Sequence, residues 1–340
     1  MKIPVAMAFA VGLASAAVHA QSADIDAHLA AAKAAVGKEH QVLFTSLCSA
    51  EPTGPGTRAA GAGAGQRQGT AAGGQRQGAP AAAPAPPARD RWHADPVKVF
   101  DNLYFLGMTE FSAWAVTTSE GIIIIDALFD YSVDDEVSEG LKKLGLDPTT
   151  IKYVVISHGH GDHSGGAKYL QDSFKAHVIL SAADWDLLDR SRGTKPARDM
   201  VAVDGQKLTL GDTTITMYLT PGHTAGTLSY LIPVKDHGTP HLVAEWGGTA
   251  FNFPRTPENF RTYTASAVRF GDIAAKARAD AIISNHSSYD GSKEKIPALK
   301  ARKPGEPNPY VIGTDAVKRY LKVAEECSKA AELRVATKQP

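Results

Sequence analysis

The sequence predicts an α/β protein in which two β-sheets stack face to face and carry helices on both outer sides, a four-layer α/β/β/α sandwich. Twice along the chain, strand-length apolar runs are followed by segments with helical spacing, as expected for two sheets with helices outside. The run at 121–126 carries four consecutive isoleucines, which is typical of a strand buried on both faces. With 340 residues, 43% of them hydrophobic, the chain can bury a sizeable core in one or two domains.

The first half of the predicted sandwich begins with two short strands on either side of Asp101-Asn102, a natural turn pair. A later helix has apolar residues on one face and ends at Gly145. The predicted strands are 97–100, 103–106, 113–117, 121–126 and 151–156, and the predicted helices are 133–144 and 165–173.

The second half repeats this order. Gly211-Asp212 is expected to turn a hairpin, and a long amphipathic segment precedes the last short strand. The predicted strands are 178–180, 206–210, 213–219, 228–234, 241–244 and 281–284, and the predicted helices are 182–190, 257–277 and 315–331.

The chain is predicted to have four segments: a signal peptide at 1–20, a short N-terminal segment at 21–51, a low-complexity linker at 52–90 and a folded domain at 91–340. The first 20 residues combine Lys2, an apolar stretch and the small-x-small site Val18-His19-Ala20. A membrane anchor is the alternative, but the apolar stretch is shorter than the ~20 residues that span a bilayer. We therefore expect export to a bacterial-type periplasm, with no membrane span.

The linker at 52–90 is rich in Ala, Gly, Pro, Gln and Arg and repeats the pentapeptide Gly-Gln-Arg-Gln-Gly at 65–69 and 74–78. It lacks the large apolar residues that would compensate for the entropy of ordering, so it is predicted to be a disordered tether. Lys and Arg together equal Asp and Glu together, at 36 each, so the net charge offers no argument for nucleic acid or an anionic membrane as a partner.

Two cysteines are present, Cys48 and Cys327. In an oxidising compartment the pair could form a disulfide between the N-terminal region and the C-terminal helix, and two free buried thiols are the alternative. Neither cysteine is near the histidine motifs, so sulfur ligation of a metal is not expected.

The richest stretch for chemistry is Ser157-His158-Gly159-His160-Gly161-Asp162-His163, directly after a buried strand. Imidazole and carboxylate form the ligand set that zinc prefers. Histidines 158 and 160 can project to one side, and residues 162 and 163 point elsewhere into the same cleft. This geometry favours two neighbouring metals, each still lacking one protein ligand.

Two further histidines follow strand ends and can supply the missing ligands. His223 lies in Thr-Pro-Gly-His-Thr-Ala-Gly-Thr, and His286 lies in Ser-Asn-His-Ser-Ser. Either one alone would more often be an ordinary loop histidine, and the dense motif upstream is what favours metal ligation. The remaining histidines (19, 28, 40, 93, 177, 237 and 241) are interpreted as structural or surface residues.

Taken together, these motifs over roughly 97–300 resemble the metallo-β-lactamase fold superfamily. The resemblance implies the same four-layer sandwich, with two Zn²⁺ ions at the edge where the sheets meet. It implies that His158, His160 and His223 hold the first zinc and that Asp162, His163 and His286 hold the second. Asp162 would also orient the attacking hydroxide, which makes it the candidate catalytic residue.

Within this superfamily, glyoxalase II and many relatives bridge both metals with an aspartate, and Gly248 stands at the corresponding place here. The cysteine ligand of the first lactamase subclass is also missing. The remaining set of histidines and one aspartate resembles the third subclass of metallo-β-lactamases, which are exported. Two departures, Ser287-Ser288 after His286 and the insertion at 52–90, leave the substrate less defined than the metals.

The predicted function is therefore an exported di-zinc hydrolase that opens a β-lactam ring by attack of a zinc-bound hydroxide on the amide carbonyl. A lactonase or another ester or thioester hydrolase of the same fold is the alternative, and a non-hydrolytic metal-binding protein is a third. The expected partner is a small-molecule substrate. Asp126, at the end of the four-isoleucine strand, is a candidate acceptor for the second N–H of a ligand imidazole, or else a solvent-facing acid.

Overall fold

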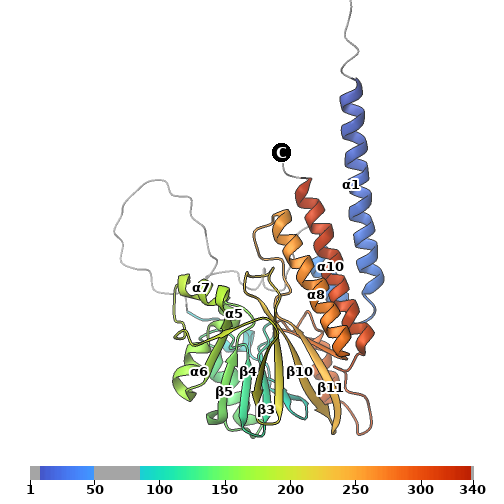
Figure 1. The fold of residues 1–340 in the computed structure, drawn as a ribbon. Helices are drawn as coiled ribbons and strands as arrows, with labels where there is room; N and C mark the ends of the chain where they lie inside the picture. Colours follow the sequence, from blue (N-terminus) through green and yellow to red (C-terminus); the bar gives the residue numbers. More distant parts are fainter. Residues whose placement is uncertain (1–7, 50–84, 338–340) are drawn as a thin grey trace, which may run out of the picture.

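In the computed structural model of the chain, residues 8–49 and 85–337 are described (Figure 1). Residues 1–7 of the predicted signal peptide and residues 52–84 of the predicted linker lie outside these ranges. Among the described helices, none combines the length and the hydropathy needed to span a membrane.

The first sheet has seven strands in the same order in space as in sequence. The first four strands pair antiparallel, and β4 to β7 pair parallel, so β4, β5 and β6 end at one edge of the sheet. The strands are β1 (Val97–Phe100), β2 (Leu103–Phe105), β3 (Trp114–Thr118), β4 (Gly121–Ile125), β5 (Ile151–Val155), β6 (His177–Ser181) and β7 (Met200–Ala202).

The second sheet has five strands in the order β12-β11-β10-β9-β8. Since β9 and β11 both pair antiparallel with β10, and β12 is parallel to β11, strands β9, β11 and β12 end at the same edge. The strands are β8 (Gln206–Leu210), β9 (Thr213–Leu219), β10 (Leu228–Asp236), β11 (Thr239–Trp246) and β12 (Ala281–Ser284).

Three apolar cores define four layers, which confirms the predicted α/β/β/α sandwich. A central core joins the facing sheets, with Val155 and Ile179 from the first meeting Tyr230 and Ile283 from the second. A second core lies under the helices of the first sheet, and a third lies between the second sheet and the long helices α8 and α10. Figure 1 shows α6 and α7 on one outer side and α8 and α10 on the other.

The helices cover both outer faces of the sandwich. The first sheet carries η3 (Asp134–Ser138), α4 (Glu139–Lys143), α5 (Gly161–Ser164), α6 (Ala167–Phe174) and α7 (Ala182–Arg190). The remaining helical elements are α1 (Ala8–Ala35), α2 (Gln41–Leu47), η2 (Arg89–Arg91), η4 (Pro148–Thr150), α8 (Pro257–Ala277), α9 (Ser292–Lys300) and α10 (Thr314–Ala336).

Two sequence-based assignments need correction. The helix predicted at 165–173 begins only at Ala167, as α6, and a separate short helix, α5, precedes it from Gly161 to Ser164. The helix predicted at 133–144 begins as the π-helical turn η3 before it continues as α4. Strand β7 and helix α9 were not predicted; β7 has only three residues, and α9 contains Pro297, which argues against a helix in sequence.

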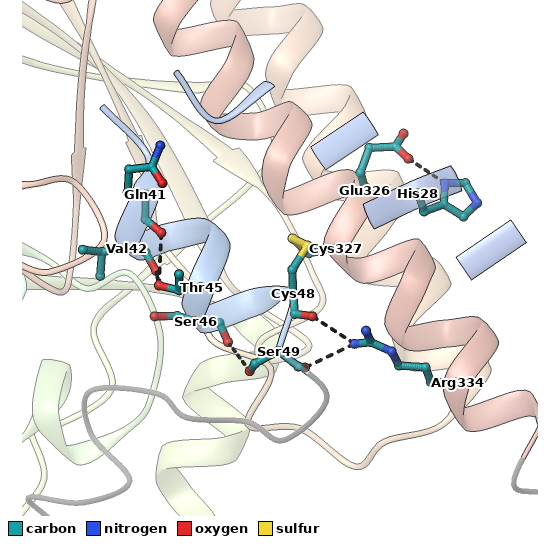
Figure 2. The surroundings of a disulfide bond; sticks show 10 residues. All are labelled: His28, Gln41, Val42, Thr45, Ser46, Cys48, Ser49, Glu326, Cys327 and Arg334. Atoms are coloured by element: carbon teal, nitrogen blue, oxygen red, sulfur yellow. Dashed lines mark hydrogen bonds and ion pairs between the residues drawn. A yellow bond between two sulfur atoms is a disulfide. The ribbon is translucent and has the colours of Figure 1, made fainter. Parts of the chain in front are cut away.

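The N-terminal helices pack on the outer face of α10 and share its core. Ala32, Val36 and Leu43 are buried there together with Tyr320 and Val323. Of the two states considered for the cysteines, the structure contains the disulfide between Cys48 and Cys327. Figure 2 shows this bond beside two polar contacts of the same interface, His28 with Glu326 and Arg334 with the carbonyl of Cys48.

Removing the disulfide with the double variant Cys48→Ala/Cys327→Ala is expected to lower the free energy of unfolding by roughly 2–5 kcal/mol. The bond spans 279 residues of sequence, so its loss releases a large loop in the unfolded chain. Urea unfolding of both proteins measures the difference. Wild-type protein treated with dithiothreitol should unfold at the variant's midpoint, and equal midpoints for oxidised wild type and variant would contradict the prediction.

His40 makes stability depend on pH in this same region. Its imidazole is 2% exposed, lies 2.8 Å from the carbonyl oxygen of Ala316 and meets the ring of Tyr320 edge-on. Burial lowers the pKa of His40 to about 4. The unfolded chain, with the ordinary histidine pKa of ~6.5, therefore binds this proton more readily than the folded chain does.

The contribution of His40 should be complete above pH 6.5 and should be lost as the pH falls from 6.5 toward 4, by up to roughly 3 kcal/mol. The variant His40→Gln keeps a side-chain amide for the Ala316 carbonyl but cannot titrate. The difference in unfolding free energy between wild type and variant, measured by urea at several pH values, should therefore change with this sign. A difference that is constant from pH 7 to pH 4.5 would refute it.

Candidate metal centre

All segments that carry the predicted metal ligands follow strand ends at one edge of the sandwich. The loop with His158 and His160 follows β5, and His163 is already part of the short helix α5. His223 follows β9, and His286 follows β12. At this edge the two sheets are joined directly, because the N–H of Leu228 in the second sheet donates to the carbonyl of Ser157, which follows β5 of the first sheet.

Three imidazoles converge in the first predicted ligand set. His223 Nε2 lies 3.0 Å from His158 Nε2 and 3.1 Å from His160 Nδ1. These nitrogens belong to a group whose potential ligand atoms all lie within 4.8 Å of one another. Two nitrogens that bind one tetrahedral zinc at ~2.0–2.1 Å are ~3.3 Å apart, so the spacing is close to that of a zinc site.

In two of these rings, the hydrogen bond made by Nδ1 determines that Nε2, which faces the other imidazoles, carries no proton. His158 Nδ1 lies 2.9 Å from the carbonyl of Gly247, and His223 Nδ1 lies 2.7 Å from the carbonyl of Ala250. A carbonyl accepts a hydrogen bond, so both rings carry their proton on Nδ1 and present a lone pair at Nε2. Two lone pairs that face each other at 3.0 Å repel, and a cation between them turns this repulsion into binding. The three-histidine set therefore fits a metal ion.

The second predicted set adjoins the first. Asp162 Oδ2 lies 3.2 Å from His163 Nε2 and 3.7 Å from His286 Nε2. A ring nitrogen of His158 also lies within 4.8 Å of the potential ligand atoms of Asp162 and His163, so the two sets adjoin at His158. His163 is fully buried, and neither of its ring nitrogens makes a hydrogen bond of normal geometry. A buried imidazole nitrogen beside a carboxylate fits a second metal ion.

Burial and neighbouring charges keep most of these imidazoles neutral. Burial lowers the pKa of His158 well below its usual value and lowers those of His223 and His286 to about 3. His163 differs, because the carboxylates of Asp162 and Asp126 outweigh its burial and raise its pKa to about 10. A metal ion that binds His163 must replace this proton, whereas the other rings already present lone pairs.

Asp126 is buried behind the second set and does not face solvent. Its Oδ2 lies 2.9 Å from His163 Nδ1, and its two oxygens also accept from the N–H and the hydroxyl of Ser157 at 2.7 and 2.8 Å. The carboxylate thus forms an ion pair with the ring of His163 and accepts hydrogen bonds at the start of the ligand loop.

Asn285 is a residue that the sequence did not single out. Its Nδ2 donates to the carbonyl of Gly247 at 2.7 Å, which is the same carbonyl that holds His158, and it lies 3.3 Å from the hydroxyl of Ser157. The only sequence signal is its position next to His286. Its partners lie just after β5 and β11, so their approach is visible only in the folded chain.

Gly248 has no room for a side chain. A Cβ atom there would lie 2.5 Å from His223 Cβ and 2.9 Å from Thr227 Cγ2. The His223 loop therefore occupies the space that a side chain at position 248 would need.

The other histidines of the described chain lie outside these sets. Histidines 28, 93, 177 and 241 pair with Glu326, Glu136, Asp199 and Asp280, and His40 bonds to a backbone carbonyl. His237 lies in the turn between β10 and β11, with φ of 48°. The surroundings of the His19 side chain lie outside the described part of the molecule.

Known proteins share this architecture. The family model described as "Metallo-beta-lactamase superfamily" matches residues 112–237, which include the first ligand motif and His223. The FEZ-1 metallo-beta-lactamase from Legionella gormanii aligns with a TM-score of 0.63 at 24% identity, over 72% of this chain and 97% of that one. A Cronobacter sakazakii metallo-beta-lactamase aligns with a TM-score of 0.61 at 27% identity, over 72% and 95%.

Curated relatives match over shorter stretches. A probable polyketide biosynthesis zinc-dependent hydrolase, BaeB, of Bacillus velezensis is 32% identical over 104 residues, which are 30% of this chain and 42% of that protein. A hydroxyacylglutathione hydrolase of Mesorhizobium japonicum is 31% identical over 109 residues, 32% of this chain and 39% of that protein. The chain thus spans about two fifths of the length of these relatives.

The match to the family model and the shared sandwich agree with each other. Residues 112–237 are similar to the metallo-beta-lactamase superfamily, and the chain has the fold of the solved metallo-beta-lactamases. Its fold is that of the solved metallo-beta-lactamases, among them BJP-1 of Bradyrhizobium japonicum, described as a subclass B3 enzyme, at a TM-score of 0.58 and 24% identity.

Proposed function

We propose that this protein is a di-zinc hydrolase that opens the β-lactam ring. The observation that carries the proposal is the pair of adjoining ligand sets, built only from histidines and Asp162, with no space for a bridging carboxylate at Gly248. His158, His160 and His223 would hold one ion, and Asp162, His163 and His286 the other. Zinc ions in such sites lower the pKa of bound water toward ~7 and polarise a carbonyl.

The residues of the chain divide the remaining tasks. The side chain of Asp162 is 23% exposed, whereas His163 is fully buried, so Asp162 is the carboxylate of the site that substrate and water can reach. It would accept a hydrogen bond from the attacking hydroxide and so orient it, while neighbouring imidazoles, His163 foremost, keep the pKa of Asp162 far below its usual value and the carboxylate charged. Asp126 would keep the ring of His163 in place throughout, because it contacts the nitrogen that faces away from Asp162.

A row of half-buried aromatic rings beside the site supports a substrate with an apolar group. The ring of Phe111 lies 5.1 Å from that of His286 and 5.0 Å from that of Phe129, and Phe129 stacks on Tyr131 at 5.0 Å. Burial, together with the carboxylates of Asp130 and Asp162, raises the pKa of Tyr131, so this phenol stays neutral beside the site. Uncharged rings of this kind would contact the side chain of a β-lactam while its amide is cleaved.

Thioester hydrolysis is the second candidate, and the hydroxyacylglutathione hydrolases among the relatives favour it. The lack of space for a side chain at Gly248 is the observation against it. Export to the periplasm would suit a β-lactam substrate and stays a prediction from the first 20 residues.

The decisive experiment measures hydrolysis of benzylpenicillin, a cephalosporin, a carbapenem, S-lactoylglutathione and an acyl-homoserine lactone by the purified, zinc-loaded protein, with and without a chelator. The proposal expects chelator-sensitive β-lactam hydrolysis and two zinc ions per chain. If only the thioester or only the lactone were hydrolysed, the protein would be a hydrolase of that class and not a β-lactamase. Metal content well below one ion per chain would reject the hydrolase altogether.

A further inference from the structure

Asp184 is a buried carboxylate that lies outside the predicted ligand sets. It is 1% exposed and belongs to the first turn of α7, which follows β6. Its Oδ2 accepts from the N–H of Gly159 and from the hydroxyl of Thr224, both at 2.8 Å, and its Oδ1 accepts from the N–H of Gly226 at 3.0 Å. The carboxylate therefore accepts three hydrogen bonds, none of them from its own helix.

These three donors belong to the two loops that supply the three-histidine set. Gly159 lies between His158 and His160, while Thr224 and Gly226 follow His223. Asp184 is thus bonded to both loops at once, although the loops are more than 60 residues apart in the chain.

Small residues allow this close contact. A Cβ atom on Gly226 would lie 2.0 Å from Ser181 Oγ and 2.7 Å from Asp184 Oδ1, and one on Gly159 would lie 3.1 Å from the carbonyl oxygen of Asp184. Any side chain at Gly226 would push the His223 loop away from Asp184.

Support of α7 is the simpler role for an acid in the first turn of a helix. In α7, however, Ser181 is the residue that caps the helix, because its hydroxyl accepts from the N–H of Asp184. The carboxylate itself is directed at the ligand loops, so its removal should affect them more than the helix.

We propose that Asp184 is a positioning residue that clamps the two loops of the three-histidine set together and so sets the spacing of His158, His160 and His223. The inference rests on the proposed metal function of that set. Partners that hold metal ligands from outside the coordination sphere change metal affinity by about 10- to 100-fold when removed.

The test is the isosteric variant Asp184→Asn, studied by zinc titration against a chromogenic chelator and by the absorption spectrum of the cobalt(II)-substituted protein. An amide in this place turns an NH₂ group toward at least one of the three donors. We expect one of the two zinc affinities to fall about 10- to 100-fold, the other to change less than about threefold, and the cobalt bands to shift.

Asp280→Asn is the matched control. Asp280 also accepts a backbone N–H, from Leu242 at 3.0 Å, and contacts His241 at 2.7 Å, but it precedes β12 at the end opposite His286. This variant should keep both zinc affinities and the cobalt spectrum whatever its loss of thermal stability. If Asp184 contributed to stability alone, Asp184→Asn would also keep both zinc affinities and the cobalt spectrum.

The outcomes separate the two proposals. Wild-type protein without bound zinc would overturn the metal function itself, and Asp184 with it. Wild type with two zinc ions and an Asp184→Asn variant with unchanged affinities and spectrum would overturn the clamp alone. If Asp184→Asn does not fold, Thr224→Val, which removes one of the three donors, should weaken one zinc affinity about threefold or more, and an unchanged affinity would overturn the clamp.

Discussion

Replacement of Asp162 by alanine is expected to lower kcat/KM about 10²- to 10⁴-fold and to reduce the zinc content from two ions per chain to one. The carboxylate lies between His163 and His286, at 3.2 and 3.7 Å from their Nε2 atoms, so it is the one carboxylate of the proposed second ligand set. Its loss would remove a proposed ligand and the group that would orient the attacking hydroxide. A misplaced reactant alone costs about 10²-fold, and the loss of one metal ion would add to this. Steady-state kinetics and metal analysis measure both effects.

Asp162→Asn and Asp130→Ala separate the parts of this effect. Asn keeps the shape and one oxygen but loses the charge and the second acceptor oxygen, so kcat should fall while more zinc is retained than in the alanine variant. Asp130 is an exposed carboxylate whose charge reaches Tyr131 near the site, and its removal should leave kcat/KM within about threefold of wild type, as is usual for an exposed charge. Unchanged hydrolysis and metal content in Asp162→Ala would exclude Asp162 from the mechanism.

Helices and strands whose ends carry capping or turn residues could be predicted from sequence with the correct first and last residues. Helix α8 runs from Pro257 to Ala277 as expected, because Thr256 caps its first turn and Arg278 leaves the helix in a left-handed conformation. The hairpin of β8 and β9 and the helix α7 also have the predicted bounds. In each of these cases, local residues are sufficient to start and stop the element.

The clustering of the candidate metal ligands could be predicted because each is a chemically distinctive side chain behind a strand end. Most of the groups that contact these side chains could not be predicted. Asp126, which follows a strand and contacts His163, is the exception. Backbone carbonyls such as those of Gly247 and Ala250 leave no trace in sequence, since every residue has one. Asp184 looks like any acid in the first turn of a helix, and only the fold brings it to Gly159 and Thr224.

Replacement of Gly248 by aspartate should damage the centre rather than turn it into a carboxylate-bridged one. The first side-chain atom would lie 2.5 Å from His223 Cβ, so the His223 loop must move before a carboxylate could approach either ion. Forced overpacking of this kind costs about 1–3 kcal/mol in a rigid site, and a displaced ligand should lower zinc affinity at least about tenfold. Zinc titration and thermal unfolding measure these two effects.

Gly248→Ala is the matched variant, because it introduces the same Cβ without a charge. Steric displacement of His223 predicts that Ala and Asp weaken zinc binding to a similar degree and that neither variant gains activity on S-lactoylglutathione. If the aspartate variant instead bound two zinc ions as tightly as wild type and hydrolysed the thioester faster, Gly248 would be a replaceable ligand position. The distinction between this chain and its thioesterase relatives would then depend on one side chain. The crowding of His223 and Thr227 around Gly248 predicts the opposite: the loop conformation itself excludes the bridge, and several residues would have to change together to admit one.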